Sequence, residues 1–288
     1  MAIIVNMACG LANRMFQYAY SIYLKEYGYN TQVDAYTRGK LTHETVLWNK
    51  IFINARLQQA NRFLIWILGG GEDIFSRFRR KYIKFSTKVL NMPSAFDALL
   101  PSLKTQYIIG VFQNAQMVES IHEKIVELYQ FKPFQDKINI EFEKVMEGCC
   151  SVAIHVRKGK DYQERIWYKN TCDIDYYKRA VEYCKEHIAN PKFYVFADNK
   201  EWVKTNFQFF DYTLVEGNPS SGYGSHFDMQ LMTHCHHNII SNSTYSWWGA
   251  FLNRHKDKTV IIPDIWFNPN SCEEFSSTRL RCNGWISM

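Results

Sequence analysis

The sequence predicts an α/β protein made of two Rossmann-like domains that face one another. Two observations predict this class. Short apolar runs, readable as buried strands, alternate with segments in which apolar residues recur at helical spacing. This alternation begins near the first residue and begins again at Ser151. We therefore expect one domain over residues 1–148 and a second over residues 149–288.

The first domain opens with a strand, a loop and a helix. The strand is the apolar run from Ala2 to Asn6, and a turn follows at residues 8–10. Apolar residues then recur at helical spacing at Leu11, Met15, Tyr18 and Ile22. Gly28 is placed to end this helix, and residues 31–36 read as a second strand.

The remainder of the first domain gives a weaker pattern. Residues 40–105 look helical and loop-like. Residues 107–112 form another strand candidate, and an amphipathic helix is expected over residues 118–128. Pro133 and the run up to Gly148 look like a boundary region.

The second domain repeats the alternation. Strands are expected at residues 151–156, 193–197, 237–241 and 259–262. A helical face spans residues 174–188. Asp198 is expected to cap the next helix, with Glu201 at the capping-box position. Ligands of parallel α/β sheets bind at the carboxyl ends of the strands, so the loops after Asn6, Val156, Ala197 and Ile240 are the candidate site.

Composition and charge limit the function classes. The formal net charge of +6 suits a protein that handles anionic ligands such as nucleotides, and it does not require nucleic acid. The 8 cysteines form no CxxC pair and are interpreted as reduced thiols of a cytoplasmic protein. The first residues do not have the pattern of a signal peptide. The longest apolar stretch, residues 63–68, is too short to cross a bilayer.

The strongest chemical signal is the run from His155 to Tyr162, which directly follows a strand. Arg157 can hold two phosphate oxygens with its planar fork. Lys158 and Lys160 add positive charge, and Asp161 could orient an arginine or accept a proton. A basic solvated turn is the alternative interpretation, but His, Arg and Asp together after a buried strand favour phosphate binding.

The second signal is the run of small hydroxyl residues from Ser241 to Ser246, which follows another apolar run. Small residues at a helix start leave backbone N–H groups open to an anion. A plain helix cap followed by core tryptophans is the alternative. We favour phosphate binding for the Ser/Thr cluster and leave both interpretations open for Trp247 and Trp248.

These segments resemble those of the alpha-1,2-fucosyltransferases of glycosyltransferase family 11. Residues 155–162 are similar to its HxRRGDY-like segment, and residues 241–250 to its SNSSFSWWGA-like segment. The matches keep their order along the chain. The further segments that resemble the family are GLANRMFQYA at 10–19, GVFQ at 110–113, FADNKEWV at 196–203, and Asp228 with Leu231 and Met232.

The resemblance implies a GT-B-like fold, GDP-fucose as donor, inversion at the anomeric carbon and no required metal or other cofactor. It implies that Arg157 binds the donor pyrophosphate, that Asp228 contacts the guanine, and that Asn13 lies near the phosphates or the fucose. The first domain would then hold the acceptor and the second most of the GDP. The expected donor-binding residues are Gly10, Asn13, Arg14, His155, Arg157, Lys158, Asp198, Asp228, Ser243, Thr244 and Ser246.

The sequence departs from the family pattern at three places. Ala12 stands where the family has glycine, and Lys158 stands where it has arginine. Lys160 is one extra residue before Asp161, so the carboxylate of Asp161 can be displaced. Arg157, Asp161 and Glu164 are the catalytic candidates. Asp161 and Glu164 both stay open as the general base.

Metal-binding patterns are better explained without a metal. Asp173 and Asp175 form a DxD motif, but they stand at a helix start, where aspartates cap N–H groups. The run from His234 to His237 has no second ligand cluster at zinc-site spacing. The sequence also contains neither a P-loop motif nor GxGxxG after a strand.

We therefore expect an enzyme that transfers L-fucose from GDP-fucose to the 2-hydroxyl of a terminal galactose or similar sugar. Its acceptor would be an oligosaccharide or a lipid-linked glycan of the cell surface. Two alternatives stay open: a transferase for another nucleotide sugar or linkage, and a non-catalytic sugar- or nucleotide-binding module. A donor panel separates the first, and a single-turnover assay separates the second.

Residues 77–88 are basic and contain no acid. Phe75, Phe78, Tyr82 and Phe85 are interleaved with the cations Arg77, Arg79, Arg80, Lys81, Lys84 and Lys88. Such a segment can lie peripherally on the anionic headgroups of the inner membrane. The alternative is a basic helix on a solvated face whose aromatic side chains pack inward.

Overall fold

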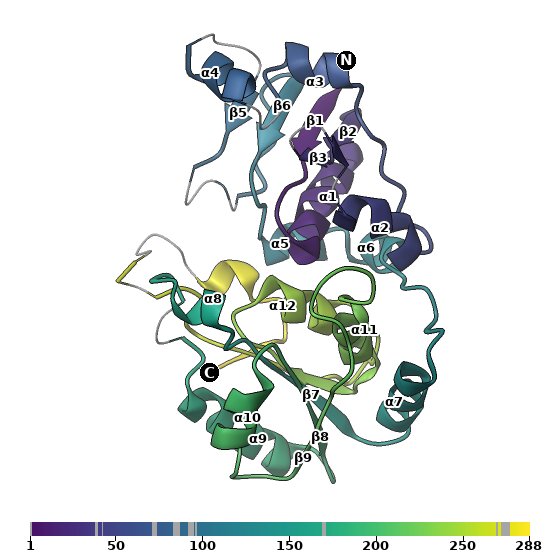
Figure 1. The fold of residues 1–288 in the computed structure, drawn as a ribbon, viewed down its shortest axis with the longest axis vertical. Coiled ribbons are helices and arrows are strands. Elements are labelled where there is room, and N and C mark those ends of the chain that lie inside the picture. The colour runs from purple at the N-terminus through teal and green to yellow at the C-terminus, as the bar shows by residue number, and fades with distance from the viewer. Residues whose placement is uncertain are drawn as a thin grey trace. The chain divides into compact units, whose positions relative to one another are not determined.

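The computed structural model describes residues 2–37, 40–41, 43–70, 74–82, 87–91, 95, 97–168, 171–268, 270–271 and 277–288. The chain divides into two compact units, Met1–Lys132 and Pro133–Met288. Each unit contains a parallel sheet with helices packed on it (Figure 1). The predicted α/β class with two Rossmann-like domains is confirmed, while the predicted facing of the two stays a prediction.

The first unit is built on a parallel sheet with the order β2-β1-β6-β5. Its central strand, β1, is buried along its whole length. Gly28 has φ +78° and ends α1, as predicted. The elements of this unit are β1 (Ile3–Asn6), α1 (Leu11–Glu26), β2 (Thr31–Asp34), β3 (Tyr36–Thr37), β4 (Lys40–Leu41), α2 (His43–Ile51), α3 (Arg62–Ile67), α4 (Ile74–Tyr82), β5 (Thr87–Val89), β6 (Gln106–Ile109), α5 (Ala115–Glu119) and α6 (His122–Leu128).

Two details of this sheet differ from the prediction. Strand β6 ends at Ile109, short of the predicted residue 112, and the left-handed φ of +52° at Phe112 excludes that residue from a strand. Strand β5 lies inside the basic segment and pairs with β6, so Lys88 belongs to a sheet and not to a helix. Lys84 and Phe85 lie outside the described residues.

A close approach ties the chain after α3 to this sheet. A Cβ added at Gly70 would lie 2.4 Å from Cε2 of Tyr107, so only glycine lets the backbone pass here. Tyr107 is buried on β6. Its hydroxyl accepts a hydrogen bond from Asn6 at 2.9 Å and donates one to Asp34 at 2.7 Å. The chain after α3 therefore packs directly on the residue that joins the ends of β1 and β2.

The second unit is built on a parallel sheet with the order β9-β8-β7-β10-β11-β12. The chain runs outward from β7 in one direction and from β10 in the other, which is the strand order of the dinucleotide-binding Rossmann fold. Its elements are α7 (Lys137–Glu147), β7 (Ser151–Val156), α8 (Lys160–Gln163), α9 (Ile174–His187), β8 (Lys192–Ala197), α10 (Lys200–Asn206), β9 (Tyr212–Leu214), α11 (Phe227–His234), β10 (His237–Ile239), α12 (Thr244–Phe251), β11 (Val260–Ile262), the 3-10 helix η2 (Ser277–Leu280) and β12 (Ile286–Ser287).

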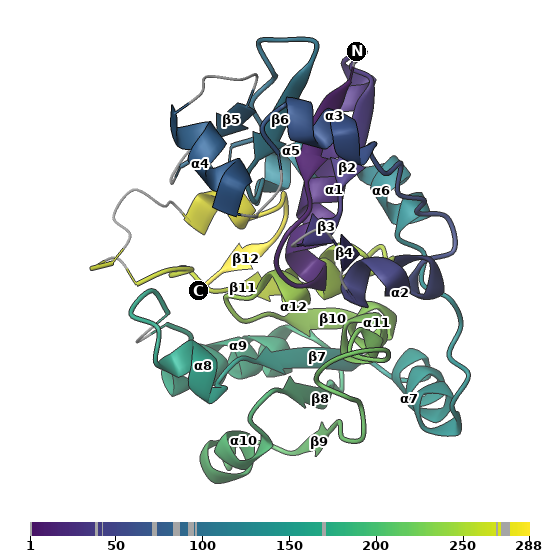
Figure 2. The same cartoon turned by 45° about the horizontal axis from the view of Figure 1, so that its top comes forward.

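Helices cover both faces of this sheet. Helices α9 and α10 share one apolar core with β7 and β8, while α11 and α12 contact each other on the opposite face (Figure 2). Tyr176 and Tyr177 of α9 are buried, and their hydroxyls donate to the carbonyl oxygens of Ile240 at 2.6 Å and His155 at 3.1 Å. These bonds link α9 to the carboxyl ends of β7 and β10.

Helix α7 belongs to the second unit, whereas the sequence analysis placed it before the boundary at residue 148. The division lies between Lys132 and Pro133. The physical reason is packing: α7 contacts α11, and Asn139 is hydrogen-bonded to Asn218 at 2.8 Å. The apolar pattern of residues 137–147 predicts a helix, but it does not predict which of the two sheets the helix packs on.

Candidate functional site

The carboxyl ends of β7 and β10 form the switch point of the second sheet, where the chain leaves neighbouring strands in opposite directions. Such a point opens a crevice that binds ligands in Rossmann-like sheets. The loops that border it are residues 157–159 after β7 and residues 240–243 after β10. The buried ring of His155 joins the two sides, because its Nδ1 is hydrogen-bonded to Oγ of Ser241 at 2.7 Å.

Arg157 is the first residue after β7. Its Nη1 lies 3.1 Å from Oδ2 of Asp198, and its side chain is about one-third exposed, at 35%. The guanidinium carbon lies 5.6 Å from the ring centroid of Tyr162. The guanidinium is therefore held by a carboxylate and an aromatic face while part of it reaches solvent. This is the geometry of a preorganised anion-binding group.

Asp198 follows β8 and serves the loop after β7. Besides Arg157, its carboxylate accepts a hydrogen bond from the backbone N–H of Lys158 at 2.7 Å. The predicted capping role of Asp198 is wrong. Asn199 caps α10 instead, since its side chain accepts from the N–H of Trp202 at 3.0 Å. The charged guanidinium of Arg157 is a stronger partner for Asp198 than a backbone N–H of α10, so the neutral amide of Asn199 caps the helix.

The side chain of Lys158 contacts Thr171 and Trp202. Its Nζ donates to the carbonyl oxygen of Thr171 at 3.1 Å and lies 5.4 Å from the ring centroid of Trp202. Burial lowers the pKa of the Lys158 amine, and nearby anionic groups including Asp198 act against that shift. Its predicted contact with the donor stays a prediction.

The N-terminus of α12 borders the other side of the switch point. The N-terminal turn of a helix leaves N–H groups without a carbonyl partner in the helix and carries positive potential. Ser243 is the N-cap residue and makes no side-chain capping bond, and Ser243 and Thr244 are half-buried. Ser246 is buried, and its hydroxyl donates to the carbonyl oxygen of Ser243 at 3.1 Å.

The two tryptophans that follow are core residues. Trp247 and Trp248 are fully buried, and Nε1 of Trp247 donates to the carbonyl oxygen of Leu280 at 2.7 Å. Of the two interpretations that the sequence left open, packing is the one that the structure supports.

His155 is neutral at physiological pH. Burial, with a further contribution from the positive charge of Arg157, lowers the pKa of His155 to about 3. It is therefore placed to hold the loop after β10 through Ser241 and not to add positive charge to the crevice.

Asp228 lies in the first turn of α11, at the carboxyl edge of the same sheet. Its Oδ1 accepts a hydrogen bond from Asn218 at 2.7 Å. Burial raises the pKa of the Asp228 carboxyl, against the effects of that bond and of the Lys200 charge. The N–H of Met229 donates to the hydroxyl of Tyr245 at 2.8 Å, which places Asp228 beside the start of α12.

The two candidates for the general base lie on or next to α8. Glu164 is the C-cap residue of α8, its side chain is 66% exposed, and its Oε1 lies 3.9 Å from Nζ of Lys160. Asp161 lies within α8, and its side chain is outside the described residues. The extra Lys160 is absorbed as the first residue of this helix.

The first unit brings together its own predicted residues. Gly10 is the N-cap residue of α1, where it is exposed. The amide oxygen of Asn13 accepts a hydrogen bond from Gln113 at 2.9 Å. Arg14 is only 2% exposed, and its Nε donates to the carbonyl oxygen of Cys9 at 2.8 Å. Arg14 thus supports the loop after β1, and its role in donor binding stays a prediction.

Sequence reasoning missed two supporting residues. Tyr162 lies under Arg157, and its hydroxyl donates to the carbonyl oxygen of Asn242 at 2.8 Å, so it joins both sides of the switch point. Gln17 accepts from the N–H of Ala8 at 2.8 Å and donates to the carbonyl oxygen of Gly110 at 2.9 Å. Both lie inside the family-like segments, which was the available signal.

Asp173 of the DxD pair caps α9, as predicted, and Asp175 lies in the first turn of that helix. Asp173 accepts from the N–H of Tyr176 at 2.9 Å, and Asp175 lies 3.4 Å from Nζ of Lys178. In the described part of the chain, one group of side chains is close enough to hold a metal ion: Glu143, Glu147 and His234. These residues precede β7 and β10, so they lie at the amino edge of the sheet, away from the loops that carry Arg157.

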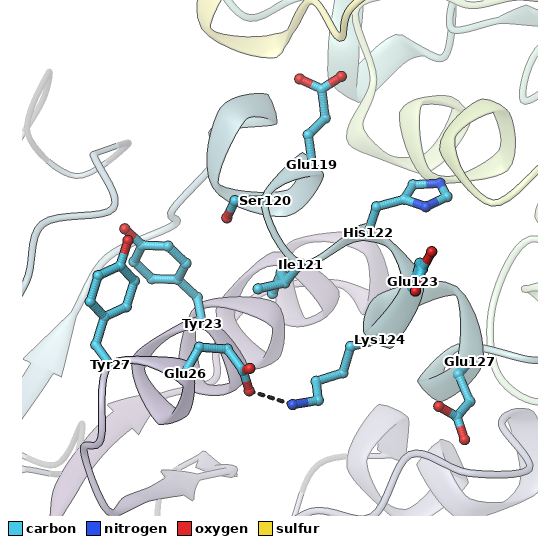
Figure 3. A pocket seen from close by; sticks show the side chains of 10 residues that line it. All are labelled: Tyr23, Glu26, Tyr27, Glu119, Ser120, Ile121, His122, Glu123, Lys124 and Glu127. Carbon is cyan, nitrogen blue, oxygen red and sulfur yellow. Dashed lines mark hydrogen bonds and ion pairs between the residues drawn. The ribbon is translucent and has the colours of Figure 1, made fainter.

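A hollow in the first unit lies between the end of α1 and the α5–α6 segment (Figure 3). Tyr23 and Tyr27 line one side, and Glu26 forms an ion pair with Lys124. The other carboxylates that line it are Glu119, Glu123 and Glu127. This excess of negative charge disfavours an anionic nucleotide, so the donor is not expected here.

The described helices include none that is both long and apolar enough to span a bilayer.

Known proteins resemble this chain in sequence and in fold. A family model described as glycosyl transferase family 11 matches residues 81–287. The O-antigen biosynthesis glycosyltransferase WbnK of Escherichia coli is 32% identical over 190 residues, which are 63% of this chain and 60% of that protein. An alpha-1,2-colitosyltransferase of Escherichia coli is 29% identical over 290 residues, and 95% of each chain is covered.

The crystal structure of NodZ alpha-1,6-fucosyltransferase soaked with GDP-fucose has a TM-score of 0.50 to this chain, at 13% identity. The match covers 87% of this chain and 91% of that one. At this identity the likeness concerns the fold, and it confirms the GT-B-like class.

Proposed function

Because the chain belongs to glycosyl transferase family 11 and is therefore a glycosyltransferase, we propose that it transfers a fucose-type deoxy sugar in glycan synthesis. The donor is GDP-fucose, the acceptor is the 2-hydroxyl of a terminal galactose, and the anomeric carbon is inverted. The observation that carries the proposal is the arrangement at the switch point, where the Arg157–Asp198 pair lies after β7 and β8 and the N-terminus of α12 lies after β10.

The chemistry follows from where charge develops. The acceptor oxygen attacks the anomeric carbon while the bond to the diphosphate oxygen breaks, so negative charge grows on the leaving diphosphate. Fixed positive groups aimed at that charge lower the barrier. Arg157 supplies a guanidinium that Asp198 keeps oriented, and the first turn of α12 supplies N–H groups.

These groups also support transfer without a metal ion. The test is an assay in EDTA, with and without added manganese. We expect the rate to be unchanged. Loss of activity that manganese restores would assign the charge stabilisation to a metal and contradict this part of the proposal.

The acceptor hydroxyl must lose its proton to a base, and Asp161 and Glu164 are the two candidates. Removing a general base typically costs about 100- to 10,000-fold in rate. The variants Asp161→Asn and Glu164→Gln therefore identify it, since only one should lose that much. If neither does, the base lies elsewhere in the protein and both assignments fail.

A second donor, GDP-colitose, is favoured by one observation: the alpha-1,2-colitosyltransferase relative aligns over 95% of both chains. Colitose lacks the 3-hydroxyl of fucose. A site that hydrogen-bonds this hydroxyl rejects the deoxy analogue by about 10⁴-fold or more, whereas an apolar site discriminates far less.

The deciding experiment combines donor and acceptor. Purified protein is incubated with lactose and with GDP-fucose, GDP-colitose or GDP-mannose, and the linkage of the product is read by NMR. We expect an α-1,2-linked fucosyl product. Preference for GDP-colitose would contradict GDP-fucose as the donor. A product with a different linkage would contradict the 2-hydroxyl as the acceptor position. No turnover with any donor under single-turnover conditions would support a binding module instead.

A further inference from the structure

Two short helices of the first unit present large apolar side chains to solvent. Phe75 and Phe78 of α4 are 84% and 61% exposed, and Trp66 of α3 is 59% exposed. Aromatic side chains of a solvated helix normally pack inward. The set of exposed large apolar side chains on the two helices, here called the aromatic face, is Phe63, Trp66, Ile67, Ile74, Phe75, Phe78 and Tyr82. The interpretation that the rings of Phe75, Phe78 and Tyr82 pack inward is therefore wrong, and Phe85 lies outside the described residues.

The helices form one surface. The guanidinium of Arg79 lies 4.8 Å from the ring centroid of Trp66, and Nη1 of Arg80 donates to the carbonyl oxygen of Gly69 at 3.0 Å. Residue Gly70 then packs on Tyr107 of the sheet. The aromatic face is thus attached to the core of the unit, with α4 beside β5 in both views (Figures 1 and 2).

Cations accompany the rings. Helices α3 and α4 contain no acidic residue, and their cations are Arg62, Arg77, Arg79, Arg80 and Lys81. Arg62, Arg77 and Lys81 are exposed. Glu72 and Asp73, between the helices, lie outside the described residues. A surface that is apolar and cationic together complements a surface that offers both negative charge and an apolar layer beneath it.

We propose that the aromatic face and its cations dock peripherally on an anionic lipid bilayer. Aromatic rings insert at the headgroup level, where one end of the ring meets the acyl chains and the other meets water. The cations remain among the anionic headgroups, where each strengthens binding about fivefold. A second copy of the chain fits less well, since a symmetric contact would bring the cations of both copies together.

The test is co-sedimentation of the full chain with vesicles of phosphatidylcholine alone or mixed with phosphatidylglycerol. We expect binding to the mixed vesicles at low salt, weakening as salt screens the charges. The variant Arg77→Gln/Lys81→Gln should bind about 30-fold more weakly. The variant Phe75→Ser/Phe78→Ser should lose at least about 10-fold. Circular dichroism checks that each variant is folded.

Helix α7 offers matched controls, because it also exposes apolar and basic side chains. The side chain of Ile138 is 59% exposed, a fraction close to the 61% of Phe78. Val145, Lys137 and Lys144 are exposed as well. The variants Ile138→Ser/Val145→Ser and Lys137→Gln/Lys144→Gln should bind vesicles as the unchanged protein does.

Three outcomes would overturn the proposal. The first is no binding to phosphatidylglycerol vesicles at low salt. The second is equal loss in the α4 and α7 variants, which would mean binding by general charge and apolarity. The third is a dimer in solution that dissociates in Phe75→Ser/Phe78→Ser, since a second copy would then cover the face. Transfer to soluble lactose is expected to be unchanged in the α4 variants, so this test is independent of the proposed function.

Discussion

Each unit has an arginine after a central parallel strand, and the two arginines differ in their contacts. Arg14 lies in the first turn of α1, the helix that follows β1, and Arg157 is the first residue after β7. Arg14 is 2% exposed and donates to the carbonyl oxygen of Cys9, which has a φ of +68°. Arg157 is partly exposed and pairs with Asp198.

The surroundings of the arginines differ in the same way. In the first unit, amides from two segments are hydrogen-bonded to each other, as between Asn13 and Gln113. In the second, a carboxylate and the aromatic face of Tyr162 hold a cation next to the carboxyl end of β7. A loop lined by neutral amides suits a neutral sugar, and a cationic loop suits a diphosphate. The contrast supports the proposed division into acceptor and donor sides.

The largest effect is expected for Arg157→Ala. Losing one preorganised donor at developing charge costs about 100- to 1000-fold in rate, and the thermal unfolding temperature should stay near that of the unchanged protein. Arg157→Lys should remain clearly impaired, because a point charge cannot reproduce a two-point grip. Steady-state rates with GDP-fucose and lactose measure both. Near-normal activity of Arg157→Ala would contradict the assignment of Arg157 to the leaving diphosphate, and with it the contrast drawn between Arg14 and Arg157.

Asp198→Asn should have the next largest effect. Asp198 binds both Arg157 and the N–H of Lys158. Hydrogen bonds to charged groups are worth about 1.5–3 kcal/mol, so we expect about a 10- to 100-fold lower kcat/KM. Asn199→Ala is the comparison variant. It removes the cap of α10 and the hydrogen bond that the Asn199 amide donates to the carbonyl oxygen of Lys158 at 3.1 Å, but it leaves the Arg157–Asp198 pair in place, so we expect a smaller loss of kcat/KM. Equal kinetic losses in both variants would mean that Asp198 acts through the shape of the loop after β7 and not through Arg157.

Arg14→Ala should lower stability and leave GDP binding nearly unchanged. The substitution leaves the carbonyl oxygen of Cys9 without the bond from Arg14, which costs about 1–3 kcal/mol in the free energy of unfolding. Urea unfolding and calorimetric titration with GDP measure the two quantities, with the exposed Arg56→Ala as control. If Arg14→Ala lowers the GDP affinity as much as Arg157→Ala does and leaves the stability unchanged, both arginines bind GDP and the contrast between them fails.

The smallest effect concerns pH. Burial and the Arg157 charge hold the pKa of His155 at about 3, below its ordinary value of 6.5. Between these values the unfolded chain binds a proton at this residue and the folded chain does not. The free energy of unfolding therefore falls as pH decreases through this range.

His155→Gln should flatten this dependence by at most one proton, about 1.4 kcal/mol per pH unit. Unfolding in urea at several pH values between 4 and 6.5 measures the slope, and the exposed His187→Gln should leave it unchanged. An unaltered slope in His155→Gln would show that His155 is protonated in the folded protein.

The sequence was sufficient where a local pattern decides the structure. The apolar run at residues 151–156 became β7 with the predicted bounds, and the strand-end rule located the loops that carry Arg157 and Ser243. The short strands β5 and β9 escaped detection, since three residues at a sheet edge carry too little apolar pattern.

What the sequence could not provide are partners distant along the chain. The capping error at Asp198 arose because its actual partner, Arg157, is invisible to any local pattern. The burial of Arg14 was likewise hidden, because arginine is usually exposed and only the packed unit shows what surrounds it. The predicted domain boundary failed to place α7 for the same reason.

The contact between Gly70 and Tyr107 has a consequence for how this family can diverge. The exposed side chains of α3 and α4 can change without touching the core, but residue 70 cannot gain even a methyl group without displacing the ring of Tyr107. Because that ring joins Asn6 to Asp34, any such change would reach the strand ends. We therefore expect glycine at position 70 to be more conserved among relatives than the exposed aromatic residues of α3 and α4. Where those aromatic residues are replaced, a glycine at this position would still indicate that the chain packs on Tyr107.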